Sequence, residues 1–316
     1  MAVPTNTFQT YSTNGIREDI ADTVFNISPT ETPFMSSIGK GKAKNTYVEW
    51  QIDNLDTATE NNAVIEGDDS TADAASSTTR VGNYTQLMDK VVQVSSTNQA
   101  VKAAGRKGEL MYQVAKRGKE LKRDIESMAL GKTGSATGSA SVARESAGVG
   151  AWLETNVDGT GTAGGFSGTT VSDYTDGAAR SLTETMFKDV VASCWAEGGN
   201  PTLVMANAAQ KQAISSFSGI ATLHRETSMS KDKASILGAA DVYISDFGEH
   251  QVVANRFMPT DCVYAIDPDY WELRYLQELS SRELSKTGHS DRRLLCVEVA
   301  LCAKNEKSSG GVFDLN

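Results

Sequence analysis

Alternating apolar and polar positions predict two strands on either side of a long polar stretch. In residues 45–52 every second side chain is apolar, and residues 86–95 repeat this period of two. The shared faces are Val48, Trp50 and Ile52 in the first strand and Met88, Val92 and Val94 in the second. The stretch between them, 53–83, holds seven acidic residues and one basic residue, Arg80. Hairpin loops usually take about two to five residues, so this stretch is either a functional extension or disordered.

A second period, of three to four residues, predicts one long amphipathic helix over residues 107–130. Its apolar stripe comprises Leu110, Val114, Leu121, Ile125 and Met128. The opposite, solvent-facing side is expected to carry Lys116, Arg117, Lys119, Lys122, Arg123 and Glu126. At about 1.5 Å per residue the helix should be about 36 Å long. Gly131 is expected to end it, and Gly118, on the stripe, would let another element approach closely.

The rest of the chain predicts a mixed lobe and a final long strand. Residues 131–180 are rich in Gly, Ser and Thr, and are expected to form loops around one apolar element at 149–153. The elements predicted after them are helix 182–197 with Ser181 as a possible cap, strand 202–206, helix 208–217 capped by Asn207, strands 241–247, 251–257 and 262–267, and strand 292–304. This order is typical of an α+β lobe. The last strand should be about 43 Å long, so it could pack beneath the long helix.

The first 38 residues predict an arm rather than part of the core. Residues 1–38 contain three of the six prolines, Pro4, Pro29 and Pro33, and little periodicity apart from a possible short helix at 15–24. We expect this arm to lie along a neighbouring subunit; the alternative is a disordered tail. The start of the chain lacks the basic and apolar segments of a secretion signal. Nowhere does an apolar run approach the roughly 20 residues of a membrane helix, so we expect a cytosolic protein.

Charge argues against a protein whose main task is to bind nucleic acid. The net charge is −10, whereas binding to phosphates depends on a surplus of Lys and Arg. Basic residues do cluster at Lys102, Arg106 and Lys107 and again along 116–123. The simplest interpretation is a solvated helix face paired with its own acidic residues. Contact with DNA, or with an acidic loop of another copy, is the alternative.

Residues that could carry chemistry are present but not in reactive patterns. Gly131-Lys132-Thr133 resembles the end of a phosphate-binding loop, but Glu126 stands where the motif needs glycine. The acidic run 66–73 lacks the alternating ligands of a calcium loop. The three histidines, His224, His250 and His289, are far apart in sequence, and Cys194, Cys262, Cys296 and Cys302 are expected to be buried free thiols. We therefore expect no catalytic, cofactor-binding or metal-binding residues, no cofactor and no enzyme.

The order of elements resembles the HK97-type capsid fold. A closer resemblance is carried by the stretches ETPFMSSIGKGKAKNTYVEWQIDNL, VSSTNQAVKAAGR, YQVAKRGKELKRDIES, ISDFGEHQVVANRFMP and VEVALCAKNEKSSGGV. This resemblance is to one branch of the fold, the major head proteins similar to that of phage SU10. It covers nearly the whole chain, and only 131–180 cannot be matched residue by residue.

The resemblance implies a division of the chain into four parts. These are an N-terminal arm (1–38), an E-loop (53–85), a P-domain (39–52, 86–179 and 286–307) with spine helix 107–130, and an A-domain (180–285 and 308–316). The E-loop would reach over an adjacent subunit. Deleting residues 55–83 should then leave a foldable monomer but abolish stable shells.

The implied function is that of a major capsid protein, which self-assembles into the icosahedral shell around the genome of a tailed bacteriophage. The implied partners are further copies in pentamers and hexamers, a separate scaffolding protein, a portal protein and decoration proteins. The shell would enclose double-stranded DNA without reading its sequence, would not contact a membrane, and would assemble in the cytoplasm of the bacterial host before becoming the virion. The alternatives are an encapsulin-like compartment, another phage structural protein such as a tail tube, or an enzyme.

Overall fold

The computed structural model describes residues 28–67, 69, 75, 77–101, 108–217, 242–286 and 288–316. Several predictions therefore fall outside the described residues: the short helix at 15–24, most of the arm, Lys102, Arg106, Lys107 and His224. Of the acidic run 66–73, the structure describes only residues 66, 67 and 69.

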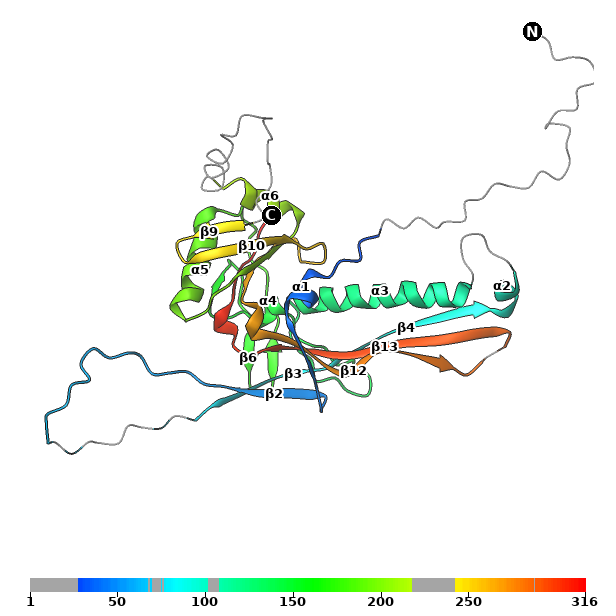
Figure 1. The fold of residues 1–316 in the computed structure, drawn as a ribbon, viewed down its shortest axis with the longest axis horizontal. Helices are drawn as coiled ribbons and strands as arrows, with labels where there is room; N and C mark the ends of the chain where they lie inside the picture. Colours follow the sequence, from blue (N-terminus) through cyan, green and yellow to red (C-terminus); the bar gives the residue numbers. More distant parts are fainter. Residues whose placement is uncertain are drawn as a thin grey trace, which may run out of the picture.

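A four-stranded sheet and one long helix form the elongated body of the protein (Figure 1). The sheet order is β1 (Gly39–Lys42), β12 (Trp271–Leu284), β13 (Ser290–Ala303) and β4 (Gln86–Ser95). Helix α3 (Glu109–Leu130) lies along one face of this sheet, and a short helix, α2 (Ser96–Ala100), follows β4. The predicted strand at 86–95 and the predicted packing of the final strand beneath the long helix are both confirmed.

The interface between α3 and the sheet is apolar at its centre. At its edge, Lys90 of β4 forms salt bridges with Glu120 and Asp124 of α3. Leu121 and Ile125 of α3 share one buried core with Leu295 and Val297 of β13. Gly118 faces Leu295, but a β-carbon at this glycine would stay 3.7 Å from the leucine side chain. That is an ordinary contact distance, so the prediction that Gly118 serves a close approach is wrong.

The prediction that Glu126 lies on the solvent side of α3 is also wrong. Glu126 is fully buried, because the short helix α1 (Pro33–Ser37) and the segment after β10 cover it. Its carboxylate accepts hydrogen bonds from the backbone N–H groups of Phe34 (2.7 Å) and Met35 (2.9 Å), and from the side-chain amide of Asn255 (2.7 Å). The sequence pattern placed this charged residue on the solvent-facing side of the helix. Three hydrogen-bond donors compensate here for the burial of its carboxylate.

Strand β2 (Tyr47–Ile52) pairs with β3 (Thr79–Tyr84), and not with β4. The acidic stretch is therefore the loop of a hairpin that closes on its own two strands, while β4 pairs with β13. Strand β3 was not predicted, since only one of its six residues, Val81, is aliphatic. Deletion of 55–83 would remove most of this strand, so the deletion must end before Thr79.

The second lobe is a six-stranded sheet with one face on the body and the other under two helices. Its order is β5 (Val157–Asp158), β14 (Gly310–Val312), β11 (Val263–Ile266), β8 (Leu203–Ala206), β10 (Gly248–Ala254) and β9 (Val242–Ser245). Leu203 and Met205 face the body core, whereas Val204 and Ala206 face helices α5 (Glu184–Ala196) and α6 (Ala208–Ser215). All four residues of β8 are apolar and buried, which is the continuous apolar run typical of a strand that is covered on both faces.

The remaining short elements connect the two sheets. They are α4 (Val149–Trp152), β6 (Gly165–Ser167) paired with β7 (Thr170–Ser172), and the 3-10 turns η2 (Pro268–Tyr270) and η3 (Glu306–Ser308). The expected loop region around 149–153 is thus confirmed. Asn207 caps α6 as predicted, by accepting from the N–H of Gln210. Helix α5 is capped by Thr183 and not by Ser181.

Strand β12 was not predicted, and it places residues 271–284 in the four-stranded sheet. The sequence grouped them with 180–285, yet β12 pairs with β13 from Trp271–Ala303 to Leu284–Arg292. Irregularities between Tyr275 and Ser280 interrupt the register. Bulges of this kind break the period of two, which is why the strand has no clear alternation.

Candidate assembly surfaces

The loop of the β2–β3 hairpin leaves the body as an extended flap, defined here by residues 53–67 and the described residues that follow up to Thr78 (Figure 1). Three large apolar side chains on it are exposed, Leu55 by 99%, Val64 by 81% and Ile65 by 77%. Residues 53–67 contain Asp53, Asp56, Glu60 and Glu66 and no basic residue. Exposed apolar groups on a segment without its own core are typical of an interaction site.

The root of the flap is held rigidly by Asn83 of β3. The Asn83 side-chain amide donates to the carbonyls of Leu301 (2.7 Å) and Ala147 (3.2 Å), and its oxygen accepts from the N–H of Ala147 (3.0 Å). Trp50 of β2 also packs on Trp152 of α4, with ring centroids 5.5 Å apart. The flap therefore projects from a fixed base, so its direction is set by the body.

The neighbouring Thr85 and Arg144 fix the same base through a buried carboxylate. Glu298 of β13 accepts from the hydroxyl of Thr85 (2.7 Å) and forms a salt bridge with Arg144 (2.7 Å). Because both partners are in place, the buried charge is neutralised and hydrogen-bonded, as burial of a charge requires.

The root of the arm is fixed by the buried Glu126 described above. Burial raises the pKa of the Glu126 carboxyl, and the N–H groups of Met35 and Phe34 and the amide of Asn255 oppose that rise. One side chain thus connects α1, the helix α3 and the second lobe. The chain before α1 is anchored at this point to the centre of the molecule.

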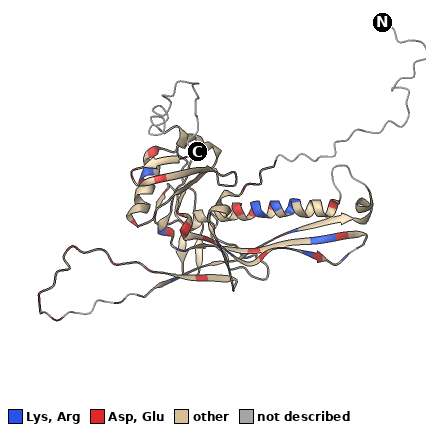
Figure 2. Ribbon diagram, viewed as in Figure 1, with Lys and Arg blue, Asp and Glu red and all other residues tan. Residues whose placement is uncertain are grey.

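Basic positions recur along α3 (Figure 2). Four of them form a basic strip, defined as Lys116, Lys119, Lys122 and Arg123, in which the three lysines are exposed and Arg123 is half-buried. Around α3 the ion pairs of the described residues join Arg117 to Glu120 (2.6 Å) and Lys90 to Glu120 (3.6 Å) and Asp124 (2.8 Å). None of these pairs includes a residue of the basic strip. The expectation that the basic side of α3 is paired with acidic residues of the same helix is met by Arg117, which forms a salt bridge with Glu120, and in part by Lys116, whose charge helps to lower the pKa of Glu120.

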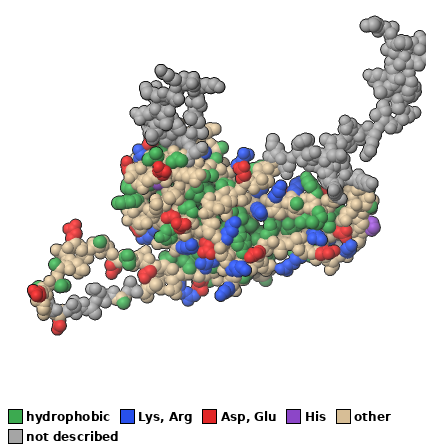
Figure 3. All heavy atoms as spheres, viewed as in Figure 1, with side chains coloured by type: hydrophobic (Ala, Val, Ile, Leu, Met, Phe, Trp, Pro, Cys, Tyr) green, Lys and Arg blue, Asp and Glu red, His purple; other side chains and the backbone are tan. Residues whose placement is uncertain are grey.

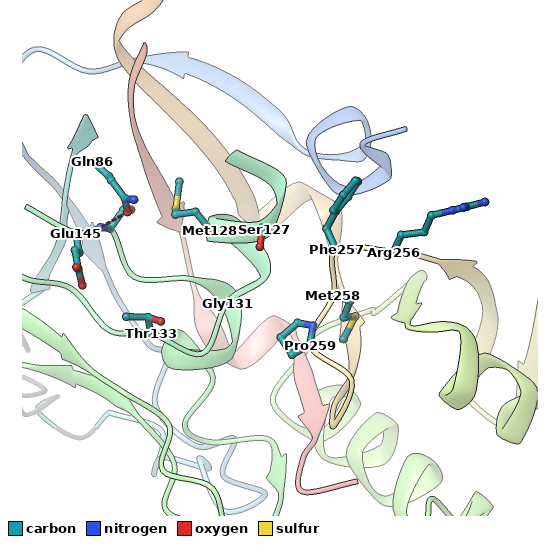
Figure 4. A pocket seen from close by; sticks show the side chains of 11 residues that line it. Gln86, Ser127, Met128, Gly131, Thr133, Glu145, Arg256, Phe257, Met258 and Pro259 are labelled. Carbon is teal, nitrogen blue, oxygen red and sulfur yellow. Dashed lines mark hydrogen bonds between the residues drawn. The ribbon is translucent and has the colours of Figure 1, made fainter. Parts of the chain in front are cut away.

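A recess of about 610 Å³ opens where the C-terminal end of α3 meets the loop after β10 (Figure 4). Met128 of α3 and Phe257, Met258 and Pro259 of the loop line it on one side, and Glu145 lies on the other. Arg123 stacks over the Phe257 ring, 5.2 Å from its centroid, so the basic strip continues to the rim of the recess. Arg256, also at the rim, is exposed to solvent.

A smaller apolar patch lies on the second lobe, where α5 ends beside the turn between β9 and β10. Trp195 is 60% exposed and packs against Phe247, with ring centroids 5.2 Å apart. Val242 and Ile244 of the edge strand β9 are also about half exposed. The space-filling view shows apolar side chains on this lobe and on the flap, as well as along the body (Figure 3).

The residues considered as candidates for catalysis or metal binding are instead buried or engaged in contacts that stabilise the fold. The four cysteines are buried and free, as predicted, and burial raises the pKa of Cys194, Cys262 and Cys302 to about 12. A thiol with so high a pKa is a poor nucleophile. Within the described part of the chain, no group of three or more His, Cys, Asp or Glu side chains is placed to hold a metal ion.

Lys132 and His250 are likewise engaged in packing. Lys132 bonds to Asp176 and Asp261 and holds the loop region against the second lobe. His250 is buried between the Pro201 carbonyl and the Ser245 hydroxyl (2.7 Å), and burial lowers its pKa. Among the helices of the described residues, none is long and apolar enough to cross a membrane.

Sequence comparison shows that the chain is similar to phage capsid proteins over nearly its whole length. A family model described as the SU10 major capsid protein matches residues 3–316. The major capsid protein of Escherichia phage Phieco32 is 29% identical over 349 residues, covering 99% of this chain and 98% of that protein. Both findings agree with the family that the sequence resembles.

Solved structures share the fold at low identity. The capsid of a native GTA particle has a TM-score of 0.62 and 12% identity, with 97% of this chain and 98% of that chain covered. The holo-SrpI encapsulin complex of Synechococcus elongatus has a TM-score of 0.56 and 10% identity, with 95% and 92% covered. The expected HK97-like α+β capsid fold is confirmed, and since the family model spans nearly the whole chain, the protein belongs to the SU10 major capsid protein family of tailed-phage virion components.

Proposed function

We propose that this capsid protein closes an icosahedral shell of pentamers and hexamers in which the flap of each copy lies on an adjacent copy. The observation that carries the proposal is the contrast between the flap and its root. The root is tied to the body by Asn83 and Glu298, whereas Leu55, Val64 and Ile65 beyond it are almost fully exposed. An extension that is aimed by the body, but buries nothing on it, gains contacts only from another molecule.

We also propose the functional division of the chain that the resemblance implies, with one change. The arm is 1–38, the E-loop 53–85 and the A-domain 180–270 with 308–316, while residues 271–285 join the P-domain because β12 pairs with β13. The P-domain then contains both long strands and the spine helix α3. The stiff centre would hold its shape while the E-loop and arm adapt to pentamers and hexamers.

The remaining parts of the proposal concern partners and place. Assembly takes place in the cytoplasm of the bacterial host with a separate scaffolding protein, a portal protein and decoration proteins. The shell encloses double-stranded DNA without reading its sequence, which suits a chain of net charge −10. The protein has no catalytic role and uses no cofactor. Buried cysteines with raised pKa values and the structural settings of Lys132 and His250 support this part.

Deleting residues 55–77 and closing β2 onto β3 with a short turn tests the proposal. Residues 79–84 stay, because Val81 and Asn83 belong to the core. We expect a subunit with the wild-type unfolding temperature that forms no stable shells, measured by gradient sedimentation and electron microscopy. The control replaces Leu55, Val64 and Ile65 by serine at full loop length, and should weaken assembly without removing the loop. Normal shells from the deletion variant would contradict the proposed role of the flap.

A further inference from the structure

His250 is a titratable side chain buried under the hairpin at the edge of the second lobe. It is 1% exposed and lies between the residue just before β8 and the turn of the β9–β10 hairpin. A carbonyl oxygen can only accept, so the Nδ1–H of His250 donates to the carbonyl of Pro201. The other ring nitrogen, Nε2, accepts from the Ser245 hydroxyl at 2.7 Å. Only the uncharged ring can donate from one nitrogen and accept at the other.

The Ser245 hydroxyl also organises the turn of this hairpin. Its oxygen accepts from the backbone N–H of Phe247 (3.1 Å) and lies 3.3 Å from the carbonyl of Gly248. Phe247 in turn packs on Trp195 of α5, with ring centroids 5.2 Å apart. The hydrogen bond from Ser245 to His250 therefore joins the buried ring to the part of the turn that carries the exposed aromatic pair.

Protonation of the ring removes this hydrogen bond in its present direction. Nε2 becomes a donor, and the hydroxyl proton of Ser245 has to turn to the Gly248 carbonyl, which is the longer of its two contacts. The positive charge is also buried, and burial of an unpaired charge is costly. This burial is the largest cause of the lowered pKa of His250, and the hydrogen bond to Pro201 opposes it only in part.

Within the described chain, the acidic groups near His250 are exposed or already paired. The titratable and charged groups of the elements packed around the ring are Glu184 and Lys188 of α5, Lys211 of α6, Tyr243 of β9, Asp246 of the turn and Glu249 of β10. Glu184 forms a salt bridge with Lys188 (2.8 Å) and accepts from the Tyr243 hydroxyl (3.2 Å). Lys211 donates to the Val252 carbonyl (3.1 Å). Asp246 and Glu249 are exposed to solvent.

The edge position of β9 lets the hairpin open while the rest of the sheet stays paired. Strand β9 is the last strand of the six-stranded sheet, and in the described chain it pairs with β10 alone, over four residue pairs from Val242–Gln251 to Ser245–Gly248. When β9 separates, β10 keeps its other neighbour, β8. Water then reaches the ring of His250 and hydrates its charge. Opening therefore relieves the cost of a buried imidazolium without disturbing the central strands.

From this geometry we infer that His250 is a proton-sensitive latch: the uncharged ring holds the β9–β10 hairpin closed, and a proton on the ring releases the hairpin, so that Phe247 leaves Trp195. These two rings belong to the exposed apolar patch of the second lobe, together with Val242 and Ile244. The patch therefore has one shape at neutral pH and another in acid. The latch acts within a single subunit, so it does not depend on the proposed function.

Amide exchange of the dissociated subunit between about pH 7.5 and about pH 5.5 tests the latch. Each rate is divided by that of an unstructured peptide of the same sequence at the same pH, which removes the intrinsic effect of pH on exchange. A hydrated histidine has a pKa of 6.5. If only the open hairpin takes up the proton, the open population at about pH 5.5 is about tenfold that at neutral pH. We therefore expect amides 243–245 and 248–250 to lose about tenfold of their protection, while amides 296–301 of β13 keep theirs.

Two variants separate the latch from a general effect of acid. His250→Gln cannot take up a proton in this range and should show no such loss. The matched control, His289→Gln, removes an exposed histidine and should behave as wild type. If His250→Gln does not fold, the wild-type titration still decides, because a loss of protection confined to the hairpin supports the latch. The latch is wrong if wild-type amides 243–250 keep their protection in acid, if β13 loosens equally, or if His250→Gln retains the pH response.

Discussion

Glu126 and Asp314 are both buried carboxylates, yet their surroundings move their pKa values in opposite directions. Burial raises the pKa of each group, and hydrogen bonds to the carboxylate lower it. Glu126 has three such donors, but the effect of burial is larger, so the pKa of its carboxyl is raised. Asp314 accepts from the N–H groups of Thr160, Gly161 and Gly177 and from the Tyr174 hydroxyl, at 2.7 to 2.8 Å, and from the Thr160 hydroxyl at 3.1 Å. These donors outweigh burial and lower its pKa to about 2.

Asp314 is therefore expected to stabilise the fold above its unfolded pKa and to lose this effect in acid. The contribution should be complete above about pH 4 and should disappear as the pH falls toward about 2. Asp314→Asn should lower the free energy of unfolding by about 2 kcal/mol at pH 7, and should flatten its decline between pH 4 and pH 2. Urea unfolding at several pH values measures both effects.

Asparagine is the suitable replacement because Asp314 has a φ of +58°, a conformation that asparagine also tolerates. The Asp173→Asn variant is a useful comparison, since Asp173 lies in the same loop region but, among the described residues, has a single backbone donor, the N–H of Gly134. An Asp314→Asn variant as stable as wild type at pH 7 would show that the five hydrogen bonds of this carboxylate contribute little.

Glu126 should respond differently, because its raised pKa means that the ionised form is disfavoured in the fold. Its titration contributes stability below the unfolded pKa that is lost as the pH rises through the folded pKa. Glu126→Gln removes this pH dependence, but turns an amide N–H toward one of three converging donors. We expect a net loss of about 1 to 3 kcal/mol at neutral pH, with faster amide exchange at Phe34 and Met35. Unchanged exchange at these two amides would mean that Glu126 does not hold the arm root.

At the scale of elements, the sequence predicts those parts whose burial follows a regular period. Strand β4 and helix α3 are regular, so their apolar residues reveal them to within about two residues. Strand β3 is hidden because its most buried side chain, Asn83, is polar and makes its hydrogen bonds to residues 64 and 218 positions away. Strand β12 is hidden by its bulges. Both failures arise from tertiary contacts that no local pattern contains.

The candidate surfaces were predictable to a similar degree. The length and charge of the acidic stretch identify the flap, because hairpin loops of that size are uncommon and are usually functional or disordered. The recess could not be predicted, since it joins Met128 to Phe257 and Pro259, which meet only when α3 packs against the second lobe. Glu126 was misassigned for the same reason: the residues that bury it come from α1 and from Asn255.

At the scale of the whole molecule, the two lobes are not independent. Tyr264 and Ile266 of β11 belong to the same core as Leu121 of α3 and Val297 of β13. The reverse face of that strand, with Val263 and Ala265, closes the smaller core under α5 and α6. Because both faces of this sheet are packed, the two lobes cannot shift relative to each other without disrupting one of the two cores. The body should therefore behave as one stiff unit from which the flap projects.

Hydrogen exchange in the dissociated subunit and in assembled shells separates this stiff body from the flap. In the dissociated subunit we expect amides 55–65 to exchange at rates close to those of an unstructured peptide. This segment is exposed, and it contributes none of the backbone hydrogen bonds found in the described chain. In shells the same amides should slow by about tenfold or more, because the neighbouring copy now shields them. Amides 121–130 of α3 serve as the control, since they are protected in both states by the helix and the core. Slow exchange of 55–65 before assembly would mean that the flap packs on its own body, and the overlap between copies would lose its physical basis.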